Sequence, residues 1–152
     1  MLNETVMFEG LDIDWFKIAA PSVILHFASG GGFVPDEIDS NTFQISNVLL
    51  SMPEISPVVI INESLRKFVS IANTHEYDMY IKSFVEYAKR GIFSYDKSIL
   101  NDYGNSLYHL VASPLKALER HQLPEEIRGI IPSTKTFINP AVQIQVDVRV
   151  VM

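Results

Sequence analysis

The sequence predicts an α+β fold, in which a mainly antiparallel sheet of N- and C-terminal strands packs against a central group of two or three helices. Valine or isoleucine alternates with other, mostly polar, residues over residues 142–150, which indicates a strand with one buried face and favours antiparallel pairing. Between residues 40 and 90, apolar residues recur every three or four positions, as on a helix. Helices in the middle of a chain with strands at both ends are typical of α+β domains. A length of 152 residues suits one domain, over residues 1–152.

Two strands are predicted near the N-terminus, over residues 12–19 and 23–28. Pro21 fixes φ in the short turn between them. The second strand is largely apolar on both faces, one of which carries His26. We therefore expect this strand to lie in the centre of the sheet.

Three helices are expected in the middle of the chain. The first covers residues 40–51 and ends before Pro53, which cannot continue a helix. The second begins at Asn62, a favourable N-cap residue. The third covers residues 75–90, after a capping-box pattern, and ends at Gly91, which suits the position after a helix.

Strands return in the last third of the sequence. Two short strands are predicted at residues 91–95 and 107–112, and a short helix opens within residues 123–127. The strand over residues 142–150 has the clearest pattern. An exposed edge on this strand would provide a seam for a homodimer.

Composition and charge exclude several classes of function. The chain has no cysteine, which excludes disulfides, cysteine nucleophiles and thiolate metal sites. Lysine and arginine number 12 against 18 acidic residues, so the net charge of −6 argues against nucleic acid and favours a basic partner protein. We find no signal-peptide pattern, membrane span, metal motif or cofactor motif, and we expect a cytoplasmic protein with no cofactor, no metal and no membrane contact.

The stretch over residues 26–39 holds most of the candidate site. Its three glycines lack the residues of a phosphate-binding loop, and the acids that follow would repel a phosphate. We interpret the glycines as a sharp exit from a strand, with a flexible binding loop as the alternative. Trp15 joins the candidates because it and Phe16 point to opposite faces of a strand, so that one of them could be exposed. No catalytic residue is assigned, and the candidate binding residues are Trp15, His26, Ser29, Phe33, Asp36 and Glu37.

Several short motifs follow one another in an order that resembles a group of small uncharacterised bacterial proteins. The motifs are Asp14-Trp15-Phe16, the pattern H-F-x-S-G-G-G-x-x-P over residues 26–35, Ser94-Tyr95-Asp96, Pro114-Leu115, and L-P-E-E-I over residues 123–127. The resemblance extends over residues 14–127. Some small acidic proteins of this kind act as immunity factors that neutralise a secreted toxin, so the resemblance implies an immunity-type role. It carries no catalytic residue to this chain.

Two hypotheses about function follow. The first is a non-catalytic protein that binds a basic partner, of which a toxin is one example. The alternative is a small enzyme or ligand-binding domain with its site near residues 26–39, where His26 or Ser29 would meet an acid such as Asp36, Glu37 or Asp96.

Overall fold

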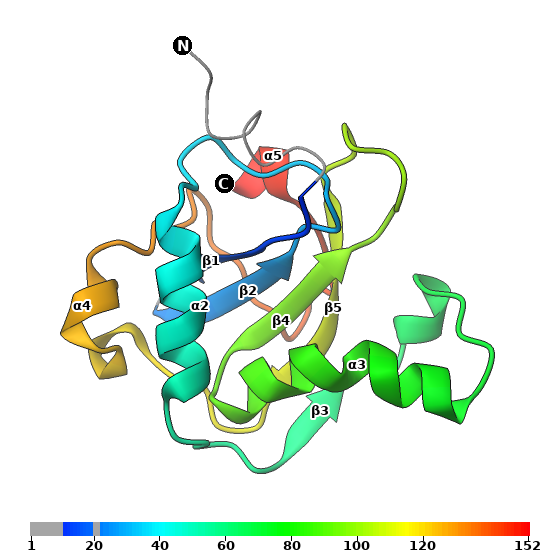
Figure 1. Cartoon of the computed structure of the whole chain (residues 1–152), viewed down its shortest axis with the longest axis horizontal. Helices are drawn as coiled ribbons and strands as arrows, with labels where there is room; N and C mark the ends of the chain where they lie inside the picture. The colour runs from blue at the N-terminus through cyan, green and yellow to red at the C-terminus, as the bar shows by residue number, and fades with distance from the viewer. Residues whose placement is uncertain (1–10, 20–21) are drawn as a thin grey trace.

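A curled sheet of six strands forms the centre of the computed structural model, which describes residues 11–19 and 22–152 (Figure 1). The predicted α+β class is therefore confirmed. The strand order is β1-β2-β4-β5-β3, and β6 pairs with the start of β5, while β3 pairs with its end. In chain order, the described elements are β1 (Asp14–Ala19), β2 (Val23–Ala28), α2 (Asn41–Ser51), β3 (Val59–Ile61), η1 (Leu65–Lys67), α3 (Thr74–Lys89), β4 (Phe93–Lys97), β5 (Leu107–Pro114), η2 (Arg120–Gln122), α4 (Glu125–Arg128), β6 (Gln145–Asp147) and α5 (Val148–Val151).

The sheet is mixed, because β2 and β4 are parallel whereas the other strand pairs are antiparallel. Parallel neighbours require a long crossover. The chain between β2 and β4 provides it, since this segment contains α2, β3 and α3. The central helices of the prediction are thus the crossover between two adjacent strands of the sheet.

The two faces of the sheet are covered by different parts of the chain. Helices α2 and α3 lie in front of the sheet in Figure 1, and we call the face they cover the helix face. The segment after β2 and the C-terminal residues from Ile138 pack on the other face, which we call the loop face. Side chains alternate along a strand, so His26 lies on the helix face and Phe27 on the loop face.

Two of the predicted elements are wrong over most of their length. The helix expected from Asn62 is only the short η1, because Asn62 binds β5 instead: its amide nitrogen donates to the Leu110 carbonyl. The strand expected over residues 142–150 is only β6, after which Asp147 caps the helical turn α5 by accepting a hydrogen bond from the Arg149 N–H. In both places a polar side chain fixes a local structure that competes with the apolar pattern.

The third predicted helix is confirmed as α3, including both of its ends. The Asn73 side chain accepts a hydrogen bond from the Glu76 N–H, as an N-cap does, and Gly91 has a φ of 89° just after the helix. The turn at Ala20 and Pro21 lies outside the described residues. No helix of the described part of the chain is long and apolar enough to cross a bilayer.

Candidate functional site

Two of the candidate binding residues, Trp15 and Ser29, are buried and hold the fold together. Trp15 is fully buried on the loop face and stacks on Phe27 with ring centroids 4.2 Å apart. Phe16 is buried as well, so neither aromatic is exposed. The Ser29 hydroxyl, also buried, accepts a hydrogen bond from the Ile13 N–H and donates one to the Leu11 carbonyl. Ser29 therefore joins the start of β1 to the end of β2.

The glycine run forms the predicted exit from a strand. Gly30 and Gly31 have φ values of 56° and 80°, which other residues rarely adopt. A Cβ atom on Gly32 would lie 2.5 Å from Cε of Lys97. The Lys97 side chain thus passes directly beneath the loop, and its ammonium donates to the carbonyls of Ile99 and Asp102 and to the amide oxygen of Asn105.

Phe33 and Glu37 lie away from the helix face and contact basic residues. Glu37 forms an ion pair with the buried Lys17, and the Arg149 guanidinium lies 4.4 Å from the centre of the Phe33 ring. These two candidates, together with Asp36, border an open hollow of about 370 Å³ beside the C-terminal residues. Because His26 lies on the helix face, the structure does not bring it together with Asp36 or Glu37.

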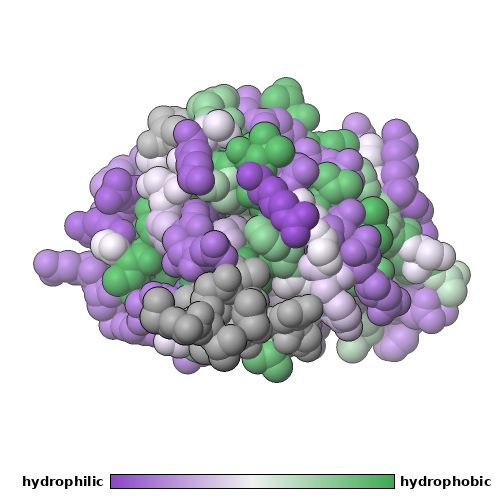
Figure 2. Space-filling model, turned by 90° about the horizontal axis from the view of Figure 1, so that it is seen from above, coloured by the Kyte–Doolittle hydropathy of each residue, from purple (hydrophilic) through white to green (hydrophobic). Residues whose placement is uncertain are grey.

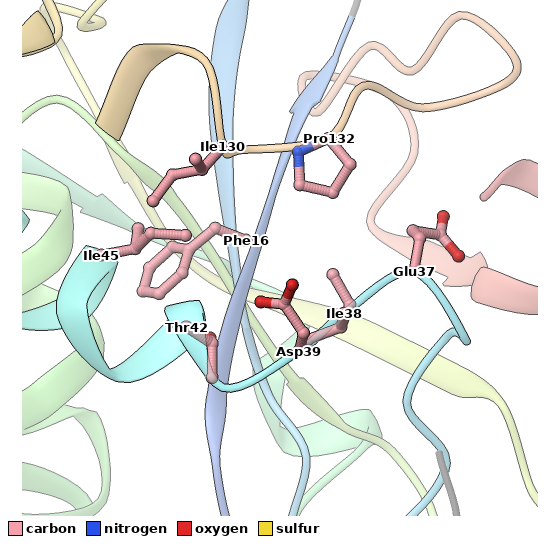
Figure 3. A pocket seen from close by; sticks show the side chains of 8 residues that line it. All are labelled: Phe16, Glu37, Ile38, Asp39, Thr42, Ile45, Ile130 and Pro132. Atoms are coloured by element: carbon pink, nitrogen blue, oxygen red, sulfur yellow. The ribbon is translucent and has the colours of Figure 1, made fainter. Parts of the chain in front are cut away.

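A small cavity lies between the outer edge of β1 and α2 (Figure 3). Phe16, Ile45 and Pro132 point into it, and its volume is about 10 Å³. That volume is enough for one water molecule and too small for an organic ligand. The edge of β1 beside it is closed, since the Ile18 N–H donates to the Pro132 carbonyl.

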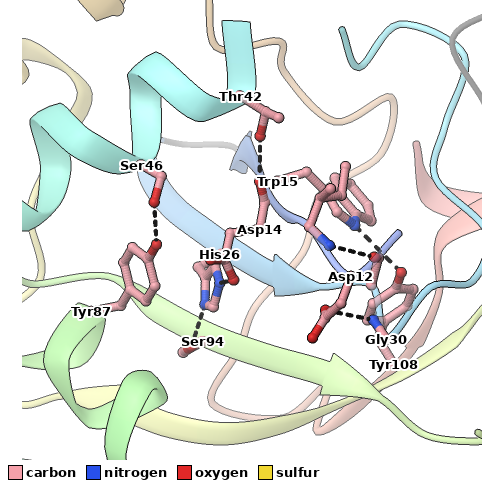
Figure 4. Close-up of polar contacts among 12 residues, drawn as sticks. Asp12, Asp14, Trp15, His26, Gly30, Thr42, Ser46, Tyr87, Ser94 and Tyr108 are labelled. Carbon is pink, nitrogen blue, oxygen red and sulfur yellow. Dashed lines mark hydrogen bonds and ion pairs between the residues drawn. The ribbon is translucent and has the colours of Figure 1, made fainter. Parts of the chain in front are cut away.

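His26 connects an acid and a hydroxyl on the helix face (Figure 4). Its Nε2 lies 2.7 Å from Asp14 Oδ1, and its Nδ1 contacts the Ser94 hydroxyl. The ring stacks on Tyr87, with centroids 3.9 Å apart, and the Tyr87 hydroxyl bonds to Ser46 of α2 at 2.7 Å. The imidazole is thus held on every side by β1, β4 and α3.

The exposure of Asp14, His26 and Ser94 decides which of these groups can meet a ligand. Ser94 and His26 are fully buried, whereas the Asp14 side chain is 44% exposed. Burial raises the pKa of the Asp14 carboxyl, but the hydrogen bond and charge of His26 outweigh burial, so the net shift lowers this pKa. The arrangement therefore presents an ionised carboxylate to solvent, and its hydroxyl is out of reach of a substrate.

A second polar chain lies beside the first, also on the helix face. The Tyr80 hydroxyl donates to Asp96 Oδ2 at 2.6 Å and lies 3.1 Å from His109 Nε2. Because that hydroxyl has one proton, Nε2–H of His109 must be the donor to Tyr80. His109 Nδ1 then accepts from the Ser98 hydroxyl at 3.1 Å, and Ser98 in turn accepts from Gln145. Every donor of this chain points towards the Asp96 carboxylate.

Sheet register aligns the two chains in one row. Asp14 pairs with Ala28, Ala28 with Asp96, Asp96 with His109, and His109 with Gln145. Paired residues on adjacent strands share a face. In this row, only the small side chain of Ala28 therefore lies between the side chains of Asp14 and Asp96. This row lies at the carboxyl ends of the parallel strands β2 and β4, which is where open sheets with parallel strands usually bind ligands.

The carboxylates near this row, Asp12, Asp14 and Asp96, form what we call the acidic edge. The pKa of Asp96 is raised to about 6: burial is the largest cause, the charges of Asp12 and Asp14 add to it, and the hydrogen bonds from Tyr80 and the Lys97 N–H oppose it. Among the described residues, no lysine or arginine side chain forms an ion pair with any of the three. Within the described chain, the acidic edge is balanced only by the His26 contact with Asp14 and by the charge of Lys97 acting on Asp96.

An open pocket of about 520 Å³ adjoins the acidic edge at Asp14, between α2 and α3. Its lining includes Tyr87 and two exposed apolar side chains, Leu50 and Met79, which are 38% and 60% exposed. It also includes Arg90, which is held by Glu86 at 3.1 Å. A protein surface that reached Asp14 would therefore contact apolar side chains beside it.

Sequence reasoning considered Asp96 as a partner acid but assigned no role to Asp14, Tyr80 or His109. One signal could have marked Asp14 and Asp96, because aspartate is depleted in strands and both residues stand in strands. Within the described residues, no three histidine or acidic side chains are grouped so that they could hold a metal ion. The chain matches no protein-family model, no curated protein and no solved structure.

Proposed function

We propose that this chain is a non-catalytic binding protein whose partner is a basic protein, and that the contact is centred on the acidic edge. The observation that carries the proposal is the sheet register, which brings Asp14 and Asp96 into one row near Asp12, where no described lysine or arginine side chain forms an ion pair with them. The motif resemblance favours an immunity-type role, in which the partner is a secreted toxin. The absence of cysteine fits a reducing cytoplasm, and we propose that location.

A lysine or arginine of the partner would change the charge balance of the acidic edge. Two opposite charges about 4 Å apart attract each other by roughly 4 kcal/mol at an effective dielectric constant of about 20. Part of that energy is lost to desolvation of the cation. The remainder is larger here than at an ordinary surface acid, since the cation also offsets the charges of Asp12 and Asp14, which add to the effect of burial on the pKa of Asp96.

A protein fits this surface better than a small cation does. Leu50 and Met79 are exposed next to Asp14, so a partner with apolar side chains beside its basic residue gains contact area. On the face that Figure 2 shows, which is seen from above Figure 1, hydrophobic residues are scattered among hydrophilic ones outside the grey residues. Such a mixed surface is typical of partners that also exist apart from each other.

The test uses a fluorescent peptide of alternating arginine and leucine, whose binding is followed by anisotropy. The variant Asp12→Asn/Asp96→Asn keeps the acceptor oxygens for Gly30 and Tyr80 and removes two charges. Its affinity for the peptide should fall about tenfold, by the usual worth of an ion pair in a partly buried site. The control Glu125→Gln/Glu126→Gln removes two exposed charges on α4 and should change the affinity less than about twofold.

Two outcomes would contradict the proposal. Equal losses in both variants would show that the peptide responds to net charge rather than to the acidic edge. A wild-type chain that does not bind the peptide at low salt would remove the basis for a basic partner.

A further inference from the structure

Strand β3 is an unprotected edge of the sheet. It ends the strand order, and no strand of the described residues pairs with its outer side. Val58, Ile60 and Leu115, which lie next to one another at this edge, are 56%, 52% and 66% exposed. Natural edge strands carry charges, prolines or bulges that prevent pairing with another chain. The three residues of β3 include none of these, so that only the shortness of the strand limits such pairing.

The backbone of β3 presents hydrogen-bonding groups to solvent at two residues. The Val58 carbonyl accepts from the Leu115 N–H at 3.3 Å, and the Asn62 N–H donates to the Val111 carbonyl at 3.0 Å. Residues 58 and 62 therefore bond towards β5. Because bonding direction alternates along an antiparallel ladder, Ile60 also faces β5, whereas Val59 and Ile61 direct their N–H and C=O groups outwards.

We propose that β3 pairs with β3 of a second copy of this chain, antiparallel and about a twofold axis at Ile60. In this register Val59 lies opposite Ile61 of the partner subunit, and Ile61 opposite the partner's Val59. Both pairs exchange two backbone hydrogen bonds, so all the outward groups of β3 are satisfied. Ile60 faces the partner's Ile60 across the axis in a pair without hydrogen bonds, where side chains are closest.

The same register fills a groove beside β3. An open groove of about 560 Å³ is lined by apolar side chains of the loop face, among them Phe93, Leu110 and Ile144, and it reaches Asn62. The partner's Val58 lies opposite Asn62, and alternation puts its side chain on the same face as Ile60. This exposed valine thus enters the groove, and the twofold axis repeats the contact in the other copy.

Charges at the ends of the paired strands match as well. Glu63 lies opposite the partner's Pro57, one residue beyond Ser56. Lys116 lies at that end of the strand, since its N–H donates to the Ser56 hydroxyl at 3.0 Å. Glu63 of each copy therefore meets Lys116 of the other. This complementarity and the self-matching register identify a second copy, rather than a foreign peptide, as the occupant of the edge. The inference stands apart from the proposed binding of a basic protein, which uses the acidic edge.

Cysteine crosslinking tests the register, because the chain has no cysteine of its own. Ile60→Cys should form a disulfide-linked dimer in oxidised glutathione at least about tenfold faster than Val58→Cys, because only residue 60 faces its own copy. Val150→Cys, on an exposed residue of α5, gives the rate of random collisions. Equal rates at residues 58, 60 and 150 would overturn the proposal.

Sedimentation equilibrium tests the dimer itself. The wild type should be dimeric at about 100 µM, as expected of a small interface of micromolar affinity. Ile60→Lys should be monomeric with an unchanged circular dichroism spectrum. Glu63→Lys should weaken the dimer, and Glu63→Lys/Lys116→Glu should restore it. A monomeric wild type would contradict the proposal, even if the edge of β3 bound a strand of another protein. A double variant that dimerises as weakly as Glu63→Lys would contradict it as well.

Discussion

Replacing Asp96 or His109 should reveal two opposite pH dependences of stability that offset each other in the wild type. The two side chains share the Tyr80 hydroxyl, at 2.6 Å and 3.1 Å. Burial raises the pKa of Asp96 from 3.8 to about 6 and lowers the pKa of His109 from 6.5 to about 4. Each shift favours the uncharged form of its group, because charge is costly at a buried position.

The sign of each contribution follows from proton linkage. The folded state binds the Asp96 proton more tightly than the unfolded state does, so this contribution is full below pH 3.8 and is lost as the pH rises through about 6. For His109 the folded state binds the proton less tightly, so the contribution is full above pH 6.5 and is lost as the pH falls through about 4. Each shift spans about two pKa units, which corresponds to roughly 3 kcal/mol of unfolding free energy.

Urea denaturation at a series of pH values measures these contributions, with fluorescence of Trp15, the single tryptophan, as the probe. The wild type should vary little between pH 4 and 6.5. Asp96→Asn should lose roughly 3 kcal/mol as the pH falls across that range, and His109→Gln should gain a similar amount. Glu125→Gln, at an exposed position, should follow the wild type. Parallel profiles for all the proteins would refute the opposed pKa shifts.

Three further substitutions test the described packing by the same denaturation assay. Gly91→Ala should lower the free energy of unfolding by more than about 3 kcal/mol, because a Cβ atom there would lie 2.4 Å from the Leu118 backbone nitrogen. As a control, Gly129→Ala should be nearly neutral, since no atom lies within 4 Å of its Cβ position. Similar losses in both variants would contradict the close contact at Gly91. Ser94→Ala should cost about 1–3 kcal/mol, because it removes the partner of a buried imidazole nitrogen, and a neutral result would mean that this contact contributes nothing. Asn73→Ala should cost about 1 kcal/mol through loss of the α3 cap, and an unchanged stability would show that the cap is dispensable.

Local sequence patterns predicted helices and strands correctly where the tertiary contacts favour the same structure as the pattern. The spacing over residues 75–90 gives α3, because Asn73 caps its start and Gly91 ends it. The same reasoning fails at Asn62, where apolar spacing indicates a helix but the Asn62 amide binds β5. It fails again in residues 142–150, where Asp147 starts a helical turn in the middle of an alternating pattern. Propensity is a weak guide at such positions, since one polar contact can outweigh it.

Strand pairing and the acidic edge depend on contacts that sequence does not reveal. The parallel pairing of β2 and β4 joins Ala28 to Asp96 across 68 residues of sequence, and no local pattern specifies it. The partners of His26 illustrate the same limit, because Asp14 and Ser94 lie 12 and 68 residues away. The sequence placed His26 in a largely apolar strand and among the candidate binding residues, and it could not name the groups that hold it. Geometry rather than order along the chain defines such a cluster.

The Asp14–His26–Ser94 cluster has the composition of a hydrolytic triad and the opposite exposure. A triad buries its acid and presents its hydroxyl to the substrate, so that the imidazole can take the hydroxyl proton during attack. Here the hydroxyl is fully buried and the acid is 44% exposed. An ionised carboxylate can only accept, so His26 Nε2–H donates to Asp14, while His26 Nδ1 contacts the Ser94 hydroxyl on the buried side. These contacts orient a surface anion and keep it ionised, as the proposed recognition of a basic partner requires, and the buried Ser94 hydroxyl is not placed to attack a substrate.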